Sequence, residues 1–221
     1  MKHIFKQLVI VLLLLSVHVV HAQKPAFWDE IQSFKHSDSI APAPQHAILF
    51  VGSSSFRIWG DVQDYFPGYT IINRGFGGSS FPDLIRYTND IIVPYKPKQI
   101  VIYCGDNDLA ASDTVTAEIV FERFKILFNN IRSKLGKVPV AYVAIKPSPS
   151  RERLMPKMLQ ANVLIKEYLR HKDKTAFIDV YHAMLTPDGK PMPGIFKEDN
   201  LHMNEKGYAI WQKLIAPYLK K

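Results

Sequence analysis

The sequence predicts an α/β protein, a three-layer α/β/α sandwich around a five-stranded parallel sheet. Short apolar segments rich in Val and Ile alternate with longer segments whose hydrophobic residues recur at helical spacing. Continuous apolar strands are typical of parallel sheets covered on both faces, and intervening helices imply right-handed crossovers. The predicted strands cover residues 47–51, 70–72, 99–104, 139–145 and 175–180.

Three helical segments supply the outer layers. Within residues 120–135, apolar side chains recur every three or four positions, and Gly136 then ends the helix. A second helix is expected over residues 155–169. The last helix begins after Asn204, whose side chain is a good N-cap.

The chain divides into three parts. Residues 1–22 combine basic residues, a short apolar run and a final Ala22, which is typical of a cleaved signal peptide. The apolar run falls short of the ~20 residues of a membrane-spanning helix. Residues 23–46 form a polar N-terminal arm with a short docked helix, and residues 47–221 form one domain. We therefore expect a secreted or periplasmic protein with no integral membrane segment after cleavage.

Charge, cysteine content and glycine spacing argue against several classes of protein. The formal net charge is +8, but the basic residues are scattered, so no nucleic-acid partner is expected. Cys104 is the only cysteine, which rules out an internal disulfide. The glycine-rich residues 75–80 lack the third glycine of the dinucleotide fingerprint, and no P-loop lysine occurs. We expect no cofactor.

Polar and glycine-rich blocks follow the predicted strands, at the edge where open parallel sheets bind ligands. Residues 52–55 (Gly-Ser-Ser-Ser) follow the first strand, residues 73–78 (Asn-Arg-Gly-Phe-Gly-Gly) the second and residues 105–108 (Gly-Asp-Asn-Asp) the third. A long loop after the fifth strand ends in residues 199–202 (Asp-Asn-Leu-His). The topology brings these blocks to one end of the sheet.

Together the blocks predict nucleophilic catalysis by Ser54. A serine hydroxyl becomes a good nucleophile when a histidine accepts its proton and a carboxylate orients that histidine. Asp199 and His202 suit these tasks if the segment turns before the last helix. The backbone N–H groups of Ser54 and of the glycine-rich turn, with the Asn107 amide, are candidate donors to an oxyanion.

Other interpretations remain open. Asp179 and His182 repeat the Asp-x-x-His spacing at the end of the fifth strand, where a buried polar pair near the rim of the site is favoured over a catalytic one. The chain could instead be a non-catalytic extracellular glycan-binding module. A metal-dependent hydrolase would draw its ligands from Asp106, Asp108, Asp179, His182, Asp199 and His202; we expect no metal.

The four blocks, in this order, resemble the SGNH/GDSL hydrolase family over residues 48–207. The resemblance implies a flavodoxin-like sandwich and a carboxylic ester hydrolase with a serine nucleophile. It assigns the nucleophile to Ser54 and the activating pair to Asp199 and His202. It assigns the oxyanion hole to the backbone of Ser54, to Gly78 and to Asn107.

Two departures from the family pattern concern the substrate. Ser53 stands where the family name has Asp, as in a branch that is platelet-activating-factor-acetylhydrolase-like or lipolytic, and Asp106 stands where Thr is frequent. The resemblance implies a small-molecule, lipid or glycan ester substrate with a short, acetyl-like acyl group. Candidates to line the cleft, or else to join the core, are Phe56, Arg57, Trp59, Phe76, Leu109 and Lys146.

Overall fold

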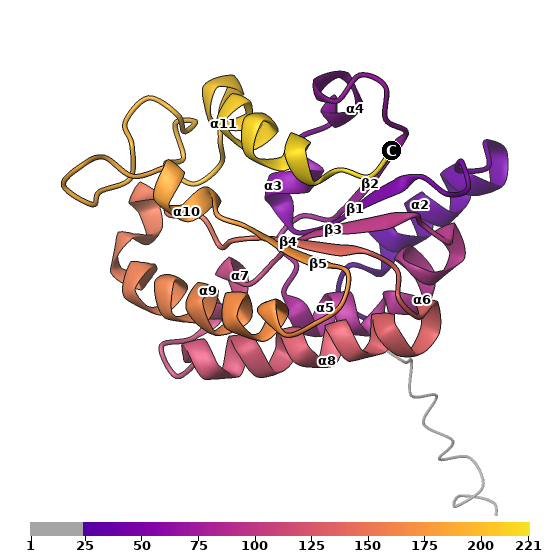
Figure 1. Cartoon of the computed structure of the whole chain (residues 1–221), viewed down its shortest axis with the longest axis horizontal. Coiled ribbons are helices and arrows are strands. Elements are labelled where there is room, and N and C mark those ends of the chain that lie inside the picture. Colours follow the sequence, from indigo (N-terminus) through magenta and orange to yellow (C-terminus); the bar gives the residue numbers. More distant parts are fainter. Residues whose placement is uncertain (1–23) are drawn as a thin grey trace, which may run out of the picture.

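The computed structural model describes residues 24–221 and has one parallel sheet at its centre (Figure 1). The strand order is β2-β1-β3-β4-β5, and every neighbouring pair is parallel. This flavodoxin-like arrangement confirms the predicted fold class. The strands are β1 (Ile48–Gly52), β2 (Ile71–Gly75), β3 (Gln99–Tyr103), β4 (Val140–Val143) and β5 (Thr175–Ile178).

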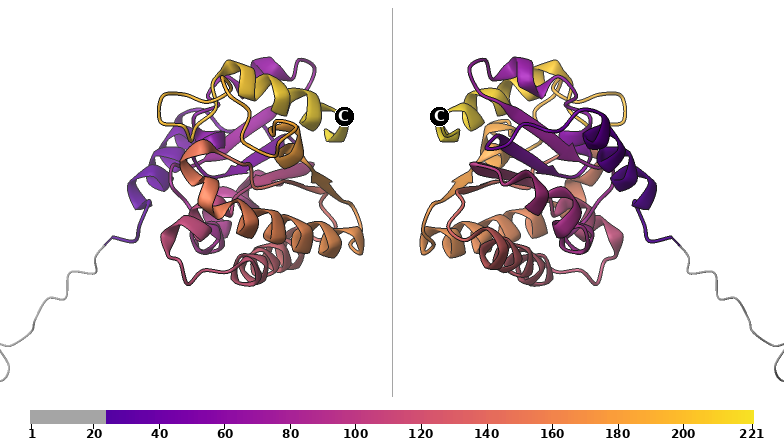
Figure 2. Two further views of the ribbon diagram at one scale, coloured as in Figure 1. Left: turned by 90° about the vertical axis from the view of Figure 1, so that its left-hand side faces the viewer. Right: turned by 90° about the vertical axis from the view of Figure 1, so that its right-hand side faces the viewer.

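Helices cover both faces of the sheet. In Figure 1, α5 (Phe81–Arg86), α8 (Ala117–Leu135) and α9 (Met155–Arg170) lie below the sheet. The opposite face is covered by α3 (Ser54–Arg57) and α11 (Glu205–Ile215), and the two side views keep this layering (Figure 2). The shorter elements are α4 (Val62–Tyr65), α6 (Thr88–Ile91), η1 (Val93–Tyr95), α7 (Asp106–Ala111), η2 (Pro149–Leu154), α10 (Val180–Ala183) and η3 (Ala216–Tyr218).

The helix boundaries follow their capping residues. The Thr116 hydroxyl accepts a hydrogen bond from the N–H of Ile119 at the start of α8, and Gly136 ends that helix with φ of 59°. The Asn204 side chain accepts from two N–H groups in the first turn of α11. The long helices predicted from periodicity and caps are therefore confirmed.

Strand β2 differs from its prediction because polar residues continue it. The apolar pattern stops at Ile72, yet the strand extends through Asn73 and Arg74 to Gly75. Asn73 donates to the carbonyl of Phe56 at 2.7 Å and accepts from the N–H of Gly75. An edge strand needs only one apolar face, so hydropathy alone underestimates its length.

The N-terminal arm contains α2 (Trp28–Ile40), which lies beside β2. Asp38 of this helix accepts a hydrogen bond from Arg74 at 2.5 Å, and it also accepts one from the Tyr95 hydroxyl. Phe27 meets Phe76 edge-to-face with ring centroids 5.3 Å apart. The predicted signal peptide, residues 1–22, lies outside the described residues.

No helix within residues 24–221 combines the length and hydropathy needed to cross a membrane.

The end of β1 leaves no space for a side chain. Gly52 has φ of 153°, and a Cβ there would lie 1.9 Å from the carbonyl oxygen of Tyr103 on β3. The next residue, Ser53, donates its N–H to that same oxygen at 3.0 Å. The chain can therefore turn directly from the strand into α3 only because residue 52 is glycine.

We expect Gly52→Ala to lower the free energy of unfolding by roughly 3 kcal/mol or more, because the added methyl group would collide with rigid backbone. Chemical denaturation monitored by circular dichroism measures this loss. Gly60→Ala is the matched control, since a Cβ at Gly60 meets no heavy atom within 4 Å. Equal stability of the two variants would contradict the steric explanation.

Candidate active site

The structure joins Ser54, His202 and Asp199 in one hydrogen-bonded chain. The Nε2 atom of His202 lies 2.9 Å from the Ser54 hydroxyl, across 148 residues of sequence. The Nδ1 atom lies 2.5 Å from Oδ2 of Asp199. Because an ionised carboxylate only accepts, Nδ1 must hold the ring proton, which leaves the Nε2 lone pair facing the serine hydroxyl.

A tight turn holds Asp199 in its ionised form. Its Oδ1 accepts hydrogen bonds from the N–H groups of Leu201 and His202, each at 2.9 Å. Asn200 between them adopts a left-handed conformation with φ of 54°. Desolvation by itself would raise the pKa of Asp199, but the His202 ring and the two backbone donors lower it to about 2.

The local structure separates Ser54 from its two serine neighbours. Ser53 and Ser55 are buried, whereas the Ser54 side chain is half-buried and faces His202. Ser54 opens α3, and the Tyr208 hydroxyl of α11 fixes that helix by donating to the carbonyl of Ser55 at 2.8 Å. Only the middle serine presents its hydroxyl to the imidazole.

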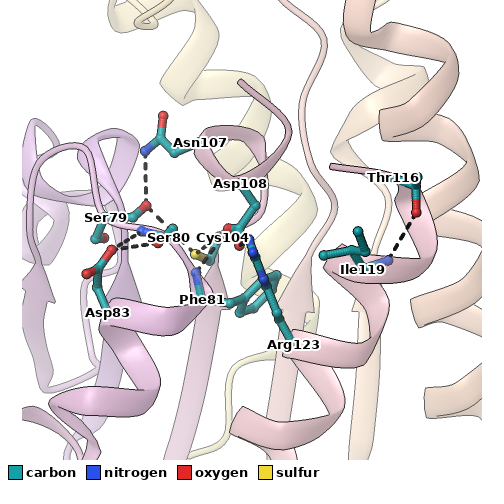
Figure 3. A network of polar contacts seen from close by, with 10 residues as sticks. All are labelled: Ser79, Ser80, Phe81, Asp83, Cys104, Asn107, Asp108, Thr116, Ile119 and Arg123. Carbon is teal, nitrogen blue, oxygen red and sulfur yellow. Dashed lines mark hydrogen bonds and ion pairs between the residues drawn. The ribbon is translucent and has the colours of Figure 1, made fainter. Parts of the chain in front are cut away.

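The candidate oxyanion donors are linked through Ser79. Its hydroxyl donates to the carbonyl of Gly52 at 3.3 Å, and its own carbonyl accepts from Nδ2 of Asn107 at 3.0 Å (Figure 3). Gly78 precedes it with φ of 81°. Within residues 24–221, the N–H groups of Ser54 and Gly78 donate to no other group, so both remain available to a ligand.

A GDSL-like lipase/acylhydrolase family model matches residues 38–210. The chain belongs to this family. Its members are acyl ester hydrolases, so the enzyme class predicted from the four blocks is confirmed. Comparison with curated proteins finds no match.

Solved structures of GDSL-like enzymes share the fold at low sequence identity. A GDSL-like lipase from Bacteroides thetaiotaomicron has 19% identity and a TM-score of 0.72, covering 85% of this chain and 95% of that one. A lipase/acylhydrolase from Enterococcus faecalis has 19% identity and a TM-score of 0.61, with coverage of 77% and 94%. A catalytic mutant of an acetylxylan esterase from Geobacillus stearothermophilus has 15% identity and a TM-score of 0.63, with coverage of 78% and 93%.

In this GDSL-like protein a buried lysine supports the loop that carries Asp199 and His202. Lys146 follows β4, is 1% exposed, and donates to the carbonyl of Leu201 at 2.7 Å. The segment between β4 and α9, which contains Lys146, donates a second hydrogen bond, from the N–H of Ser150 to the carbonyl of Asn200 at 3.0 Å. Burial lowers the pKa of the Lys146 ammonium to about 8, although Asp106 and Asp199 oppose that shift.

Asp108, which follows Asn107 in the third block, has a structural role. Its side chain is buried and accepts from the N–H of Phe81, at the start of α5, and from Arg123 of α8 (Figure 3). The carboxylate therefore fixes two helices behind the oxyanion donors. Desolvation raises the pKa of Asp108 in spite of these partners.

The alternative metal site finds no support in the part of the chain that the structure describes. Asp106 pairs with Arg151 at 2.9 Å, just as Asp108 pairs with Arg123. Among residues 24–221, no three or more His, Cys, Asp or Glu side chains converge in a way that could hold a metal ion.

The second Asp-x-x-His pair forms but stands apart from Ser54. Nδ1 of His182 lies 2.8 Å from Asp179, which also caps α10. The His182 side chain is 64% exposed, and its hydrogen bonds within residues 24–221 include no serine hydroxyl. The pair caps α10 and is not buried, so the prediction of a buried polar pair is wrong in that respect.

The candidate cleft residues lie mainly in the core. Phe56, Trp59, Phe76 and Leu109 are all at most 1% exposed, which is the core alternative of their prediction. Lys146 is buried as well, and only the Arg57 side chain, at 57%, is exposed. A residue that follows a strand can face the core as well as the cleft, and its position in the sequence does not distinguish the two. Arg151 of η2 was not among the predicted site residues because no motif surrounds it, yet its guanidinium donates to Oδ1 of Asn107 at 2.8 Å.

Proposed function

We propose that this protein is a serine esterase that removes short acyl groups, acetyl above all, from carbohydrate or lipid esters through a Ser54 acyl-enzyme. The observation that supports this proposal is the continuous hydrogen-bonded chain from Ser54 through His202 to Asp199. Family membership supplies the reaction class, and the chain of contacts supplies the residues.

The proposed reaction has two steps. As the Ser54 oxygen attacks the ester carbonyl, Nε2 of His202 takes its proton, and the Asp199 carboxylate stabilises the resulting imidazolium. The negative charge on the carbonyl oxygen meets the N–H groups of Ser54 and Gly78 and the Asn107 amide. His202 then protonates the leaving alcohol, and the same imidazole activates the water that hydrolyses the acyl-enzyme.

A short acyl group fits the surroundings of Ser54. The hydrophobic residues Phe56, Phe76 and Leu109 near the strand ends are buried in the core and cannot line a channel for a long acyl chain. A hollow of about 640 Å³ adjoins Asp199 and is lined by Phe196, Lys197, Glu198, Asp199 and Asn204. Its charged and amide side chains, beside the apolar surface of Phe196, could bind the hydroxyl groups of an alcohol such as a sugar.

We expect Ser54→Ala and His202→Ala to lower kcat on p-nitrophenyl acetate by roughly four to six orders of magnitude, because each removes a member of one catalytic unit. A fluorophosphonate probe should label the wild-type chain and fail to label Ser54→Ala, as measured by intact-protein mass spectrometry.

The control variant is His182→Ala, which breaks the same local contact with Asp179 away from Ser54. It should keep its activity within about twofold. Loss of activity in His182→Ala together with full activity in His202→Ala would assign the activating role to Asp179 and His182 instead of Asp199 and His202. Activity that survives Ser54→Ala and is abolished by EDTA would replace the serine mechanism with a metal-dependent one, and binding of acetylated sugars without turnover would favour a glycan-binding module.

The acyl preference has its own test. Across p-nitrophenyl esters from acetate to octanoate, we expect kcat/KM to fall at least ~10-fold, because the buried core residues offer no site for added methylenes. Acetylated xylo-oligosaccharides and short-chain lipid esters, assayed by acetate release, identify the alcohol. A rate that rises with chain length would refute the short-acyl proposal.

We also propose that the enzyme acts outside the cytoplasm, after removal of residues 1–22. N-terminal sequencing of the chain recovered from the periplasm or medium should begin at Gln23. Recovery of the uncleaved chain from the cytoplasm alone would refute this proposal.

A further inference from the structure

The geometry points to Arg151 as the positioning residue of the oxyanion hole: its guanidinium holds the Asn107 amide so that the NH₂ group, rather than the carbonyl, faces the reacting ester. This inference rests on the proposed function, because it assigns a task within the same reaction.

An asparagine side chain can assist an oxyanion in only one of its two amide orientations. With Nδ2 toward the site it donates a hydrogen bond, whereas a flipped amide would present the partial negative charge of Oδ1 to a developing anion. The two orientations have nearly the same shape. Neighbouring groups must therefore decide between them.

Two contacts select the productive orientation of Asn107. Nδ2 donates one hydrogen to the carbonyl of Ser79 at 3.0 Å, and Oδ1 accepts from Nη2 of Arg151 at 2.8 Å. After a flip, Oδ1 would face a carbonyl oxygen and Nδ2 would face a guanidinium, so both contacts would become repulsive. Among residues 24–221 only the Ser79 carbonyl accepts from Nδ2, which leaves its second hydrogen for the oxyanion.

Arg151 also forms a largely buried ion pair. Its Nη1 atom lies 2.9 Å from Oδ2 of Asp106, the residue directly before Asn107, and the two side chains are 17% and 5% exposed. Charges this far removed from water interact more strongly than a surface pair. The guanidinium also withdraws electron density from the amide carbonyl, which makes the NH₂ group a better donor.

The backbone around Arg151 connects both halves of the site. Arg151 lies between β4 and α9, in the same connection whose Ser150 N–H and Lys146 ammonium hold the carbonyls of Asn200 and Leu201. The donor for the oxyanion and the loop of His202 are thus fixed from one short segment. This placement explains why a charged residue outside the four sequence blocks bears on the reaction.

The test is a double-mutant cycle with Arg151→Met and Asn107→Ala, measured on p-nitrophenyl acetate. We expect Arg151→Met to lower kcat about 10- to 100-fold with KM within about twofold, because the lost contact matters mainly in the transition state. In the Asn107→Ala background the same substitution should lower kcat less than about threefold. Equal losses in both backgrounds would overturn the inference.

Arg153→Met is the matched control from the same segment. Arg153 forms an exposed ion pair with Asp113, with side chains 68% and 81% exposed, so this variant should keep wild-type kcat. If Arg151→Met fails to fold because Asp106 is left unpaired, Arg151→Lys keeps a cation beside that carboxylate and enters the same cycle. Its loss of kcat should likewise shrink in the Asn107→Ala background, and an undiminished loss would overturn the inference.

Ser54→Ala, assayed in parallel, separates this inference from the proposed function. If Ser54→Ala is inactive and the Arg151 cycle is additive, the esterase mechanism stands and only the role of Arg151 fails. If Ser54→Ala keeps its activity, the proposed function itself fails.

Discussion

The site depends on a close approach of backbone segments at the carboxyl end of β1. Gly52 is paired in register with Gly75 of β2 and with Tyr103 of β3. A Cβ at residue 52 would lie 1.9 Å from the Tyr103 oxygen, and one at residue 75 would lie 2.5 Å from the N–H nitrogen of Arg57. The absence of both side chains lets α3 start where the strand ends, which exposes Ser54.

The second part of the site, the turn of residues 199–202, lies near the C-terminal end of the chain. Hydrogen bonds rather than hydrophobic burial determine its position. The turn of residues 199–202 is held by backbone donors to Asp199 and by the left-handed Asn200. Lys146 and Ser150 fix its carbonyls from the segment after β4. The sheet thus positions Ser54, and a polar segment between β4 and α9 positions the loop of His202.

Much of this fold could be predicted from the sequence because its strands are buried on both faces. The central strands β1 and β3 are buried at every position, so their apolar segments stand out. The edge strand β2 was predicted too short, since Asn73 and Arg74 bind neighbouring segments through polar contacts that hydropathy does not register. Helix ends were predictable where a capping residue defines them, as at Asn204.

The site was only partly predictable, because identical local motifs differ in their tertiary surroundings. Both Asp-x-x-His pairs fold into the same carboxylate–imidazole contact, at 2.5 Å for His202 and 2.8 Å for His182, so spacing cannot choose between them. The choice follows from which imidazole meets Ser54. Arg151 has no local signature at all, since its partners Asp106 and Asn107 lie far away in the sequence, in α7 after β3. Taking this cation and Lys146 out of water is costly. That cost is offset for Arg151 by Asp106 and the Asn107 side-chain oxygen, and for Lys146 by the carbonyl of Leu201. The same placement puts the Arg151 guanidinium directly against the Asn107 amide.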